Sequence, residues 1–270
     1  MQKKNTTMWF RVLEMVLFLV ILLAVWQGIY YFGVDVSGIW KVYTMPSPAG
    51  AAKKVVELFG DSNIYLAILT SLRRVLIGYV ISILNGMLLG FLLSKFKFLR
   101  RNLKPVILGL QTLPSICWVP FAIIWFGLSE SAIIFVVIIG STFGVAMAVE
   151  DGLHNIDPIL VRAGKTMGAK GVKLYTKVIF PASLPMLVSG LKQGWSFAWR
   201  ALMSGEMMSA SIGLGQVLLL GRDLADINQV MVVMIVIILI GVLVDRLVFS
   251  MIEKRLRRNR GLDRDMRNEE

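Results

Sequence analysis

The stretch DPILVRAGKTMGAKGVKLYTKVIFPASLP, residues 157–185, is a polar interruption between two long apolar runs. Asp157 followed by Pro158 predicts a helix start, because an aspartate caps free backbone N–H groups and a proline at the first helical position has no N–H to lose. Gly168 can take the left-handed conformation that ends a helix. The first part of the stretch is therefore predicted to be one short helix.

A second short helix should follow and end where the prolines interrupt it, at Pro181 and Pro185. Its basic flank consists of Lys170, Lys173 and Lys177. The whole stretch is therefore predicted to be a compact pair of helices on a basic loop.

The composition places this stretch in a membrane protein. Hydrophobic residues make up 56% of the 270 residues, more than the roughly 45–50% typical of soluble domains. Six runs approach or exceed the roughly 20 residues that cross a bilayer, and they cover residues 12–32, 75–94, 105–127, 131–149, 183–208 and 229–250. The chain is predicted to be an all-α polytopic membrane protein with about six transmembrane helices, and residues 49–59 to form an amphipathic helix on the outer surface.

The net charge of +12 indicates orientation in the membrane and not nucleic-acid binding. The basic groups precede the first run, separate the second from the third and the fourth from the fifth, and follow the sixth, so alternating spans place all four on the cytoplasmic side. We therefore expect a cytoplasmic N-terminus at 1–11, a transmembrane domain at 12–250 with a cytoplasmic loop at 150–182, and a basic cytoplasmic tail at 251–270.

Enzymatic, metal and nucleotide chemistry have little support in this chain. Cys117 is the only cysteine and His154 the only histidine, so one chain cannot assemble a disulfide or the usual zinc ligand set. Gly164, Lys165 and Thr166 resemble the end of a phosphate-binding loop, but Ile159 stands where that loop needs a glycine. No cofactor is expected on this chain.

Two of the predicted spans carry candidate pathway residues. The third contains Pro114 and Pro120, and each proline removes a backbone hydrogen bond that must be replaced by protein or by a watery cavity. A helix that lines a pathway and a simple packing kink both explain this pattern.

The fifth span contains several charged and polar residues within the stretch GLKQGWSFAWRALMSGEMMS. A charge at the membrane centre costs roughly 2.5–3.5 kcal/mol on insertion scales. Lys192 can reach the cytoplasmic interface, and Glu206 is expected near the outer end. Arg200 is the deepest and needs a carboxylate, backbone carbonyls or a passing anion, so a pathway role and a fixed ion pair both remain open. With Trp195, these residues complete the candidate pathway set: Pro114, Pro120, Trp195, Arg200 and Glu206.

The loop resembles the signature of ATP-binding-cassette (ABC) importer permeases, in which a Glu-Ala-Ala triplet is followed by a glycine and a distant Leu-Pro. The triplet aligns with Arg162, Ala163 and Gly164, the glycine with Gly168, and the final pair with Phe180 and Pro181. Arginine thus replaces the acidic residue, and glycine the second alanine. MPSP at 45–48, TLPSICWVPFAIIWFGL, the fifth span and GLG at 213–215 look like the branch that handles sulfonates, nitrate and taurine.

The resemblance implies a type I ABC importer permease of the MetI-like fold in a bacterial inner membrane, with both termini cytoplasmic. It also implies a pair of ABC ATPase subunits that bind ATP and Mg, a second permease copy and an extracytoplasmic solute-binding protein. The expected ATPase-coupling residues are Arg162, Ala163, Gly164, Gly168, Ala169 and Pro181. The alternatives are a secondary transporter or channel that works without ATP and, with less support, a membrane-embedded enzyme.

Overall fold

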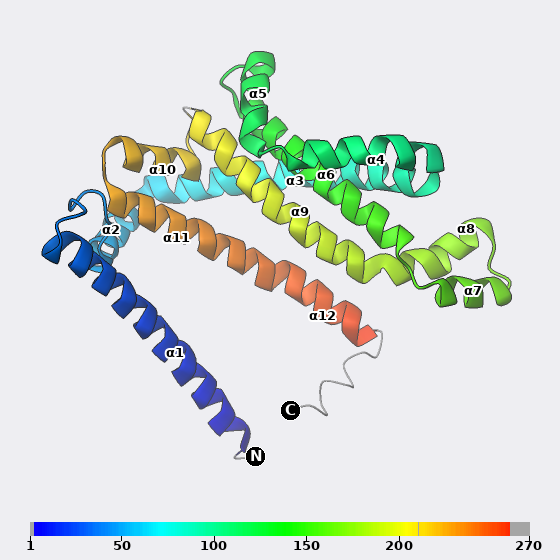
Figure 1. Ribbon diagram of the computed structural model, residues 1–270, viewed down its shortest axis with the longest axis horizontal. Coiled ribbons are helices and arrows are strands. Elements are labelled where there is room, and N and C mark those ends of the chain that lie inside the picture. Colours follow the sequence, from blue (N-terminus) through cyan, green and yellow to red (C-terminus); the bar gives the residue numbers. More distant parts are fainter. Residues whose placement is uncertain (1–2, 210, 260–270) are drawn as a thin grey trace. The chain divides into compact units, whose positions relative to one another are not determined.

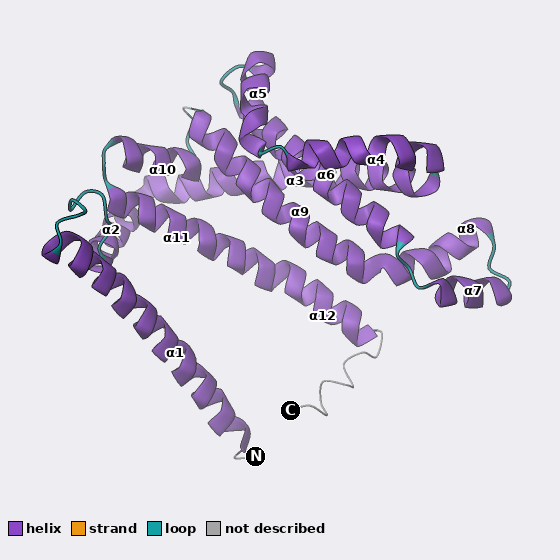
Figure 2. Ribbon diagram, viewed as in Figure 1, coloured by secondary structure: helices purple, strands orange, loops and turns teal. Residues whose placement is uncertain are grey.

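The computed structural model describes residues 3–209 and 211–259, and all regular structure in these ranges is helical (Figure 2). The elements are α1 (Lys3–Tyr30), η1 (Tyr31–Val36), α2 (Pro48–Gly60), α3 (Ser62–Lys95), α4 (Lys97–Thr112), η2 (Ser115–Trp118), α5 (Val119–Phe126), α6 (Glu130–His154), α7 (Pro158–Thr166), α8 (Gly171–Leu174), η3 (Tyr175–Ile179), α9 (Phe180–Met208), α10 (Leu214–Asp223), α11 (Ile227–Val244), η4 (Asp245–Phe249) and α12 (Ser250–Asn259). Part of the predicted tail, 260–270, lies outside the described residues.

Contacts divide the chain into two units, one formed by residues up to 65 together with 217–236, and one formed by 66–216 together with the residues from 237 onward. The described helices include five that are long and apolar enough to cross a membrane, or six if one bent pair counts as a span. The five are Leu13–Val36, Ser62–Lys95, Glu130–His154, Gly171–Met208 and Ile227–Leu256. The all-helical, polytopic prediction is therefore confirmed.

The predicted third span, 105–127, is broken at Pro114, as its sequence suggested. Its residues lie in α4 and in η2 with α5, and the two parts are bent by 100° (Figure 1). Leu113, just before Pro114, is extended with φ −68° and ψ 128°, as expected of a residue whose helical conformation would clash with the following proline ring. Pro120 instead lies in the first turn of α5, where it interrupts nothing.

The second span begins earlier than the predicted residue 75. Helix α3 starts at Ser62 and runs for 34 residues, which at about 1.5 Å per residue exceeds the hydrocarbon thickness. The Asp61 carboxylate accepts a hydrogen bond from the Asn63 backbone N–H at 3.0 Å and caps this start. Arg73 and Arg74 therefore lie within a helix and not in the segment before it.

The second unit is built on the close pairing of α6 with α9 (Figure 1). Glycines make this possible: a Cβ atom at Gly140 would lie 2.7 Å from the Ala201 Cβ, and one at Gly194 would lie 2.6 Å from Val145 Cγ2. Small residues therefore let the two helices approach closely, as is common where lipid removes a hydrophobic drive between helices.

In the first unit, α2 confirms the amphipathic helix predicted at 49–59. Ser47 caps it by accepting a hydrogen bond from the Gly50 N–H at 2.9 Å. The Ser47 N–H donates to the side chain of Asn228 at 3.3 Å, and Lys54 pairs with Asp226 at 2.8 Å. Polar contacts therefore hold α2 against the segment that begins α11.

Candidate functional site

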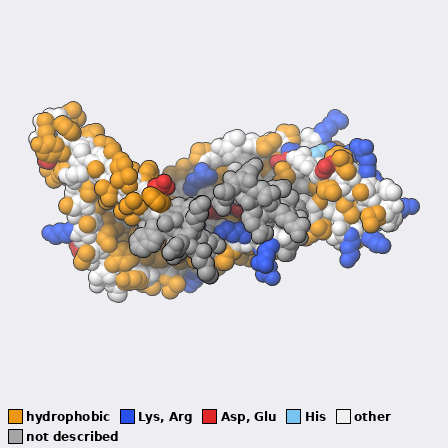
Figure 3. Space-filling model, turned by 90° about the horizontal axis from the view of Figure 1, so that it is seen from below, with side chains coloured by type: hydrophobic (Ala, Val, Ile, Leu, Met, Phe, Trp, Pro, Cys, Tyr) orange, Lys and Arg blue, Asp and Glu red, His pale blue; other side chains and the backbone are white. Residues whose placement is uncertain are grey.

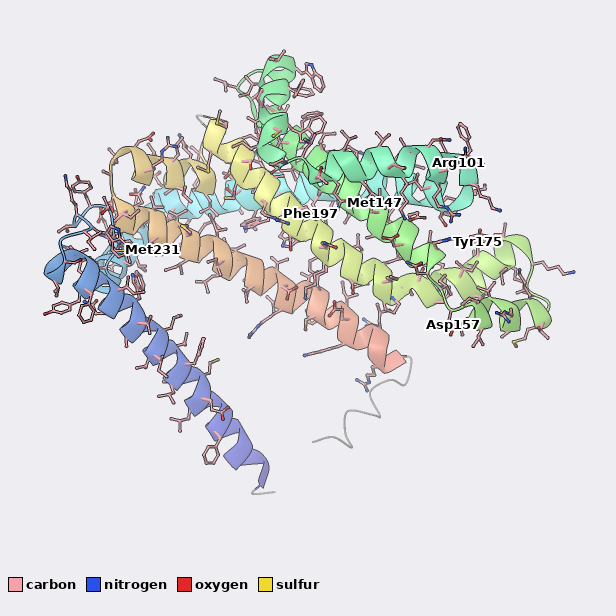
Figure 4. The ribbon with its side chains drawn as sticks, viewed as in Figure 1. Arg101, Met147, Asp157, Tyr175, Phe197 and Met231 are labelled. Atoms are coloured by element: carbon pink, nitrogen blue, oxygen red, sulfur yellow. The ribbon has the colours of Figure 1, made fainter. Side chains whose placement is uncertain are left out.

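The first helix of the 157–185 stretch forms as its sequence predicts. The Asp157 carboxylate accepts a hydrogen bond from the Ile159 N–H at 2.8 Å, and Pro158 is the first residue of α7. Gly168 adopts φ +83°, the left-handed conformation expected at this helix end, and Gly171 repeats it with φ +52°. Figure 4 shows α7 beginning at Asp157 and the chain returning to Tyr175. Two left-handed glycines therefore define the turn between α7 and α8.

The second helix does not end at Pro181 and Pro185, so this prediction is wrong. Residues 171–208 are helical without interruption through α8, η3 and α9. The turn before Pro181 is π-helical, and this wider turn relieves the clash that a proline ring makes with the carbonyl four residues earlier. A displacement of α8 is consequently passed into α9 along a continuous helix.

Close packing explains why glycine replaces the second alanine of the signature triplet. Gly164 is buried, and a Cβ atom there would lie 2.8 Å from Val178 Cγ2 and 3.2 Å from Leu174 Cδ1. The Gly164 carbonyl accepts a hydrogen bond from the N–H of Ala169 at 3.0 Å, and Ala169 is itself buried. Gly164 and Ala169 therefore hold α7 against η3 as one compact element.

The opposite side of α7 and α8 exposes apolar side chains. Met167 is 87% exposed, Val172 79% and Ile159 67%. Arg162 and Ala163, the other two triplet residues, are also exposed. Figure 3 shows Lys and Arg side chains gathered among hydrophobic ones at the end that carries α7 and α8. An apolar surface with a basic surround is typical of a protein-contact site.

A groove of about 420 Å³ runs along α9 and is closed on one side by α11 and η4. Its α9 wall carries Lys192, Ser196 and Arg200, which are four residues apart and so share one helix face. Lys192 pairs with Asp245 of η4 at 2.8 Å. Arg200 is exposed, donates from Nε to the Ser196 carbonyl at 3.1 Å and lies 4.9 Å from the Phe197 ring centre.

None of the described carboxylates pairs with Arg200, so the fixed ion pair, one of the two alternatives left open by the sequence, does not form among the described residues. Trp195 and Trp199 line the same groove, stack with ring centres 6.0 Å apart and are buried. Their indole N–H groups have no hydrogen-bond acceptor among the described residues. The α9 wall of the groove therefore carries Arg200, a cation without a described carboxylate partner, together with the stacked rings of Trp195 and Trp199.

The broken span reaches the same helix. The Ser115 hydroxyl, directly after Pro114, lies 3.3 Å from that of Ser204, and the Ser204 hydroxyl donates to the Arg200 carbonyl at 3.1 Å. The structure thus joins the residue after Pro114 to α9 one turn beyond Arg200. Pro120 does not join them, since it is exposed on α5.

Glu206 was expected near the outer end of the fifth span, where solvent could reach it. In the structure its side chain is fully buried. Its carboxylate accepts hydrogen bonds from the Ser71 hydroxyl at 2.8 Å, from Arg74 Nη1 at 3.0 Å and from the Gly215 N–H at 2.9 Å. Sequence reasoning missed Ser71 and Arg74 as its partners. The signal was present, because an arginine within an apolar run and a glutamate in another each need a partner.

Comparison with known proteins agrees with this architecture. The chain matches the family of binding-protein-dependent transport system inner membrane components over residues 82–258. A putative ABC transporter permease of Methanocaldococcus jannaschii is 31% identical over 190 residues, which are 70% of this chain and 71% of the relative. The putative aliphatic sulfonates transport permease SsuC of Escherichia coli is 28% identical, covering 80% and 86%.

The nitrate import permease NrtB of Synechococcus elongatus is 28% identical over 250 residues, with 87% of each chain covered. Among solved structures, an inward-facing MetNI methionine ABC transporter shares the fold with a TM-score of 0.61 at 20% identity, over 72% of this chain and 96% of the other. The chain therefore belongs to the binding-protein-dependent transport inner-membrane family, as a multi-pass ABC importer permease of the type I fold in the sulfonate and nitrate branch.

Proposed function

We propose that this permease conducts a small anionic solute along the α9 groove and that α7 and α8 receive the work of ATP hydrolysis. The observation that carries the first part is Arg200, an exposed cation without a described carboxylate partner in a groove with aromatic walls. Sulfonate and nitrate oxygens are strong acceptors for a guanidinium, whose planar fork matches them. The relatives named for sulfonate and nitrate transport support the same substrate class.

The second part rests on the exposed surface of α7 and α8. Met167 and Ile159 offer apolar contacts to a partner, and the continuous helix from 171 to 208 carries any displacement to Arg200. We infer that two cytoplasmic ABC ATPases, which bind ATP and Mg, seat on this surface in a complex with a second permease copy. An extracytoplasmic solute-binding protein delivers the solute, and both termini then lie in the cytoplasm.

Transport would follow from two arrangements of the helices. ATP binding favours one orientation of the groove and hydrolysis restores the other, which requires that the ATPases contact α7 and α8 differently in the two states. The Lys192–Asp245 pair lies at one end of the groove, where an arriving anion competes with Asp245 for Lys192.

Uptake into proteoliposomes tests the substrate assignment. The permease is reconstituted with its ATPase and solute-binding partner subunits, and alkanesulfonates and nitrate are offered in turn. Arg200→Gln should reduce uptake by roughly 10-fold or more, since a hydrogen bond to a charged group contributes about 1.5–3 kcal/mol, and Arg200→Lys should retain part of it. Arg222→Gln, in which an exposed ion pair with Asp223 is lost, is the matched control.

Equal uptake by wild type and Arg200→Gln would remove Arg200 from the pathway. Met167→Asp tests the coupling surface separately, because a buried charge at the contact should weaken ATPase co-purification while the permease still folds. An unchanged yield of ATPase with Met167→Asp would show that the partner binds elsewhere.

A further inference from the structure

A second cavity, of about 440 Å³, lies between α3, α6 and the α8–η3–α9 segment. Its walls are almost entirely apolar and include Met87 and Phe91 of α3, Leu153 of α6, and Val172 and Phe180. It is separate from the groove at Arg200, which is lined by other faces of α9 and by α11. A cavity of this size and composition is within the range of small-ligand sites, which span roughly 300–1,000 Å³ and are mostly apolar.

The only charged residue in the lining is Lys95, the last residue of α3. Its ammonium lies at the end of a membrane-length helix, where the hydrocarbon region gives way to headgroups. Further basic residues follow it at Lys97, Arg100 and Arg101. Tyr175 also lines the cavity and adds a hydroxyl group (Figure 4). The cavity thus combines a long apolar interior with a positive rim.

We propose that this cavity binds one anionic phospholipid, with an acyl chain between α3, α6 and η3 and the phosphate at Lys95. An acyl chain accounts for the apolar walls. The net negative charge of an anionic headgroup neutralises the single cation, whereas a zwitterionic headgroup such as that of phosphatidylcholine carries its own ammonium beside the phosphate and brings no net charge to Lys95. A soluble partner fits less well, because most of the lining comes from the long apolar helices α3, α6 and α9, and of the exposed apolar residues on α7 and α8 the lining contains Val172 alone.

The position of the site gives the lipid a regulatory role. Val172 and Tyr175 contact the occupant, and Gly171, which also lines the cavity, is one of the two left-handed glycines at the turn between α7 and α8. A bound lipid therefore stabilises one orientation of the coupling segment against the membrane helices. This step rests on the proposed placement of α7 and α8 at the ATPase contact.

Lipid binding is measured directly on the purified, delipidated permease by native mass spectrometry after addition of phosphatidylglycerol or phosphatidylcholine. Wild type should retain one phosphatidylglycerol per chain and much less phosphatidylcholine. Lys95→Gln should lower phosphatidylglycerol retention about fivefold, the effect of one lysine near an anionic surface. Lys97→Gln, which removes a neighbouring charge outside the cavity lining, is the matched control and should retain the lipid.

Leu153→Trp fills the cavity and should abolish retention. Equal retention of the two lipids by wild type, or an equal loss in Lys95→Gln and Lys97→Gln, would overturn the proposal, as would the capture of no lipid. The proposal would also be overturned if a second protein chain, and not a lipid, were found in the cavity. ATPase rates of the full transporter in nanodiscs with and without phosphatidylglycerol then test regulation, so a failure of the coupling assignment leaves the binding result intact.

Discussion

Replacing Arg74 with methionine should destabilise the permease by breaking its buried ion pair. The Arg74 side chain is 5% exposed and that of Glu206 is 0% exposed, with Nη1 and Oε1 3.0 Å apart. Arg74 also donates to the Ile212 carbonyl at 2.8 Å. Methionine fills most of the same volume, so the main effect of the substitution is the loss of charge and donors. Glu206 is then left with Ser71 and the Gly215 N–H.

The magnitude follows from burial. Removing one partner of a buried ion pair costs about 3–5 kcal/mol, because the remaining charge is uncompensated. The neighbouring Arg73 is the matched control: it pairs with Glu130, but its side chain is 59% exposed. Pairs of that kind contribute about 0–1 kcal/mol. The double variant Arg74→Met, Glu206→Met should recover much of the loss, since an apolar replacement of a whole buried pair is often tolerated.

The free energy of unfolding is measured by SDS titration in mixed micelles, with tryptophan fluorescence and circular dichroism as two probes. A double-mutant cycle between Arg74 and Glu206 should give a coupling of at least about 2 kcal/mol. The reasoning is refuted if Arg74→Met costs no more than Arg73→Met, or if the two substitutions in the cycle are additive.

Three further perturbations test local features. Gly168→Val forces a β-branched residue to φ +83°. It should lower the free energy of unfolding by about 1–3 kcal/mol and reduce co-purification of the ATPase, whereas Gly168→Asn should still co-purify with the ATPase. Gly164→Val should lower uptake, because its Cβ would lie 2.8 Å from Val178 Cγ2; Val178→Ala in the same chain should restore part of it, and no rescue would contradict the packing argument. The hydrogen bond to Asp226 raises the pKa of Lys54. Burial alone would raise the pKa of Asp226, but the hydrogen bond from Lys54 and the other favourable contacts of the carboxylate outweigh it, so the pKa of Asp226 falls below 3.8. The pair should therefore stabilise the fold by up to about 1 kcal/mol between pH 3.8 and 10.5. This stabilisation is lost as the pH falls through the pKa of Asp226 or rises through the pKa of Lys54. The free energy of unfolding of Lys54→Met should accordingly depend less on pH than that of the wild type.

Local chemistry made much of this protein predictable. Apolar runs near membrane length place the helices, and the Asp157-Pro158 start and the Gly168 end are properties of a few neighbouring residues. Charge asymmetry between loops predicted an orientation in the same way. The pairing of Gly140 and Gly194 with side chains of the facing helix, by contrast, was found only in the structure.

The errors arose where a local rule was overridden by its surroundings. Proline usually ends a helix, yet Pro181 and Pro185 lie within the run from 171 to 208, and the π-helical turn before Pro181 relieves the clash at that residue. Pro114 does break its span, by 100°. The residue types are the same in both cases, and only the backbone around each one separates the outcomes.

Hydropathy and helix capping were enough to predict a multi-spanning helical protein and both ends of α7, because they depend on residues close together in the chain. The packing of the helices was needed to show that Arg74 neutralises Glu206, 132 positions away, and that Arg200 has no described carboxylate partner. Partners at that separation are chosen by how the helices pack, so the burial of one charge and the availability of the other follow from the assembled fold.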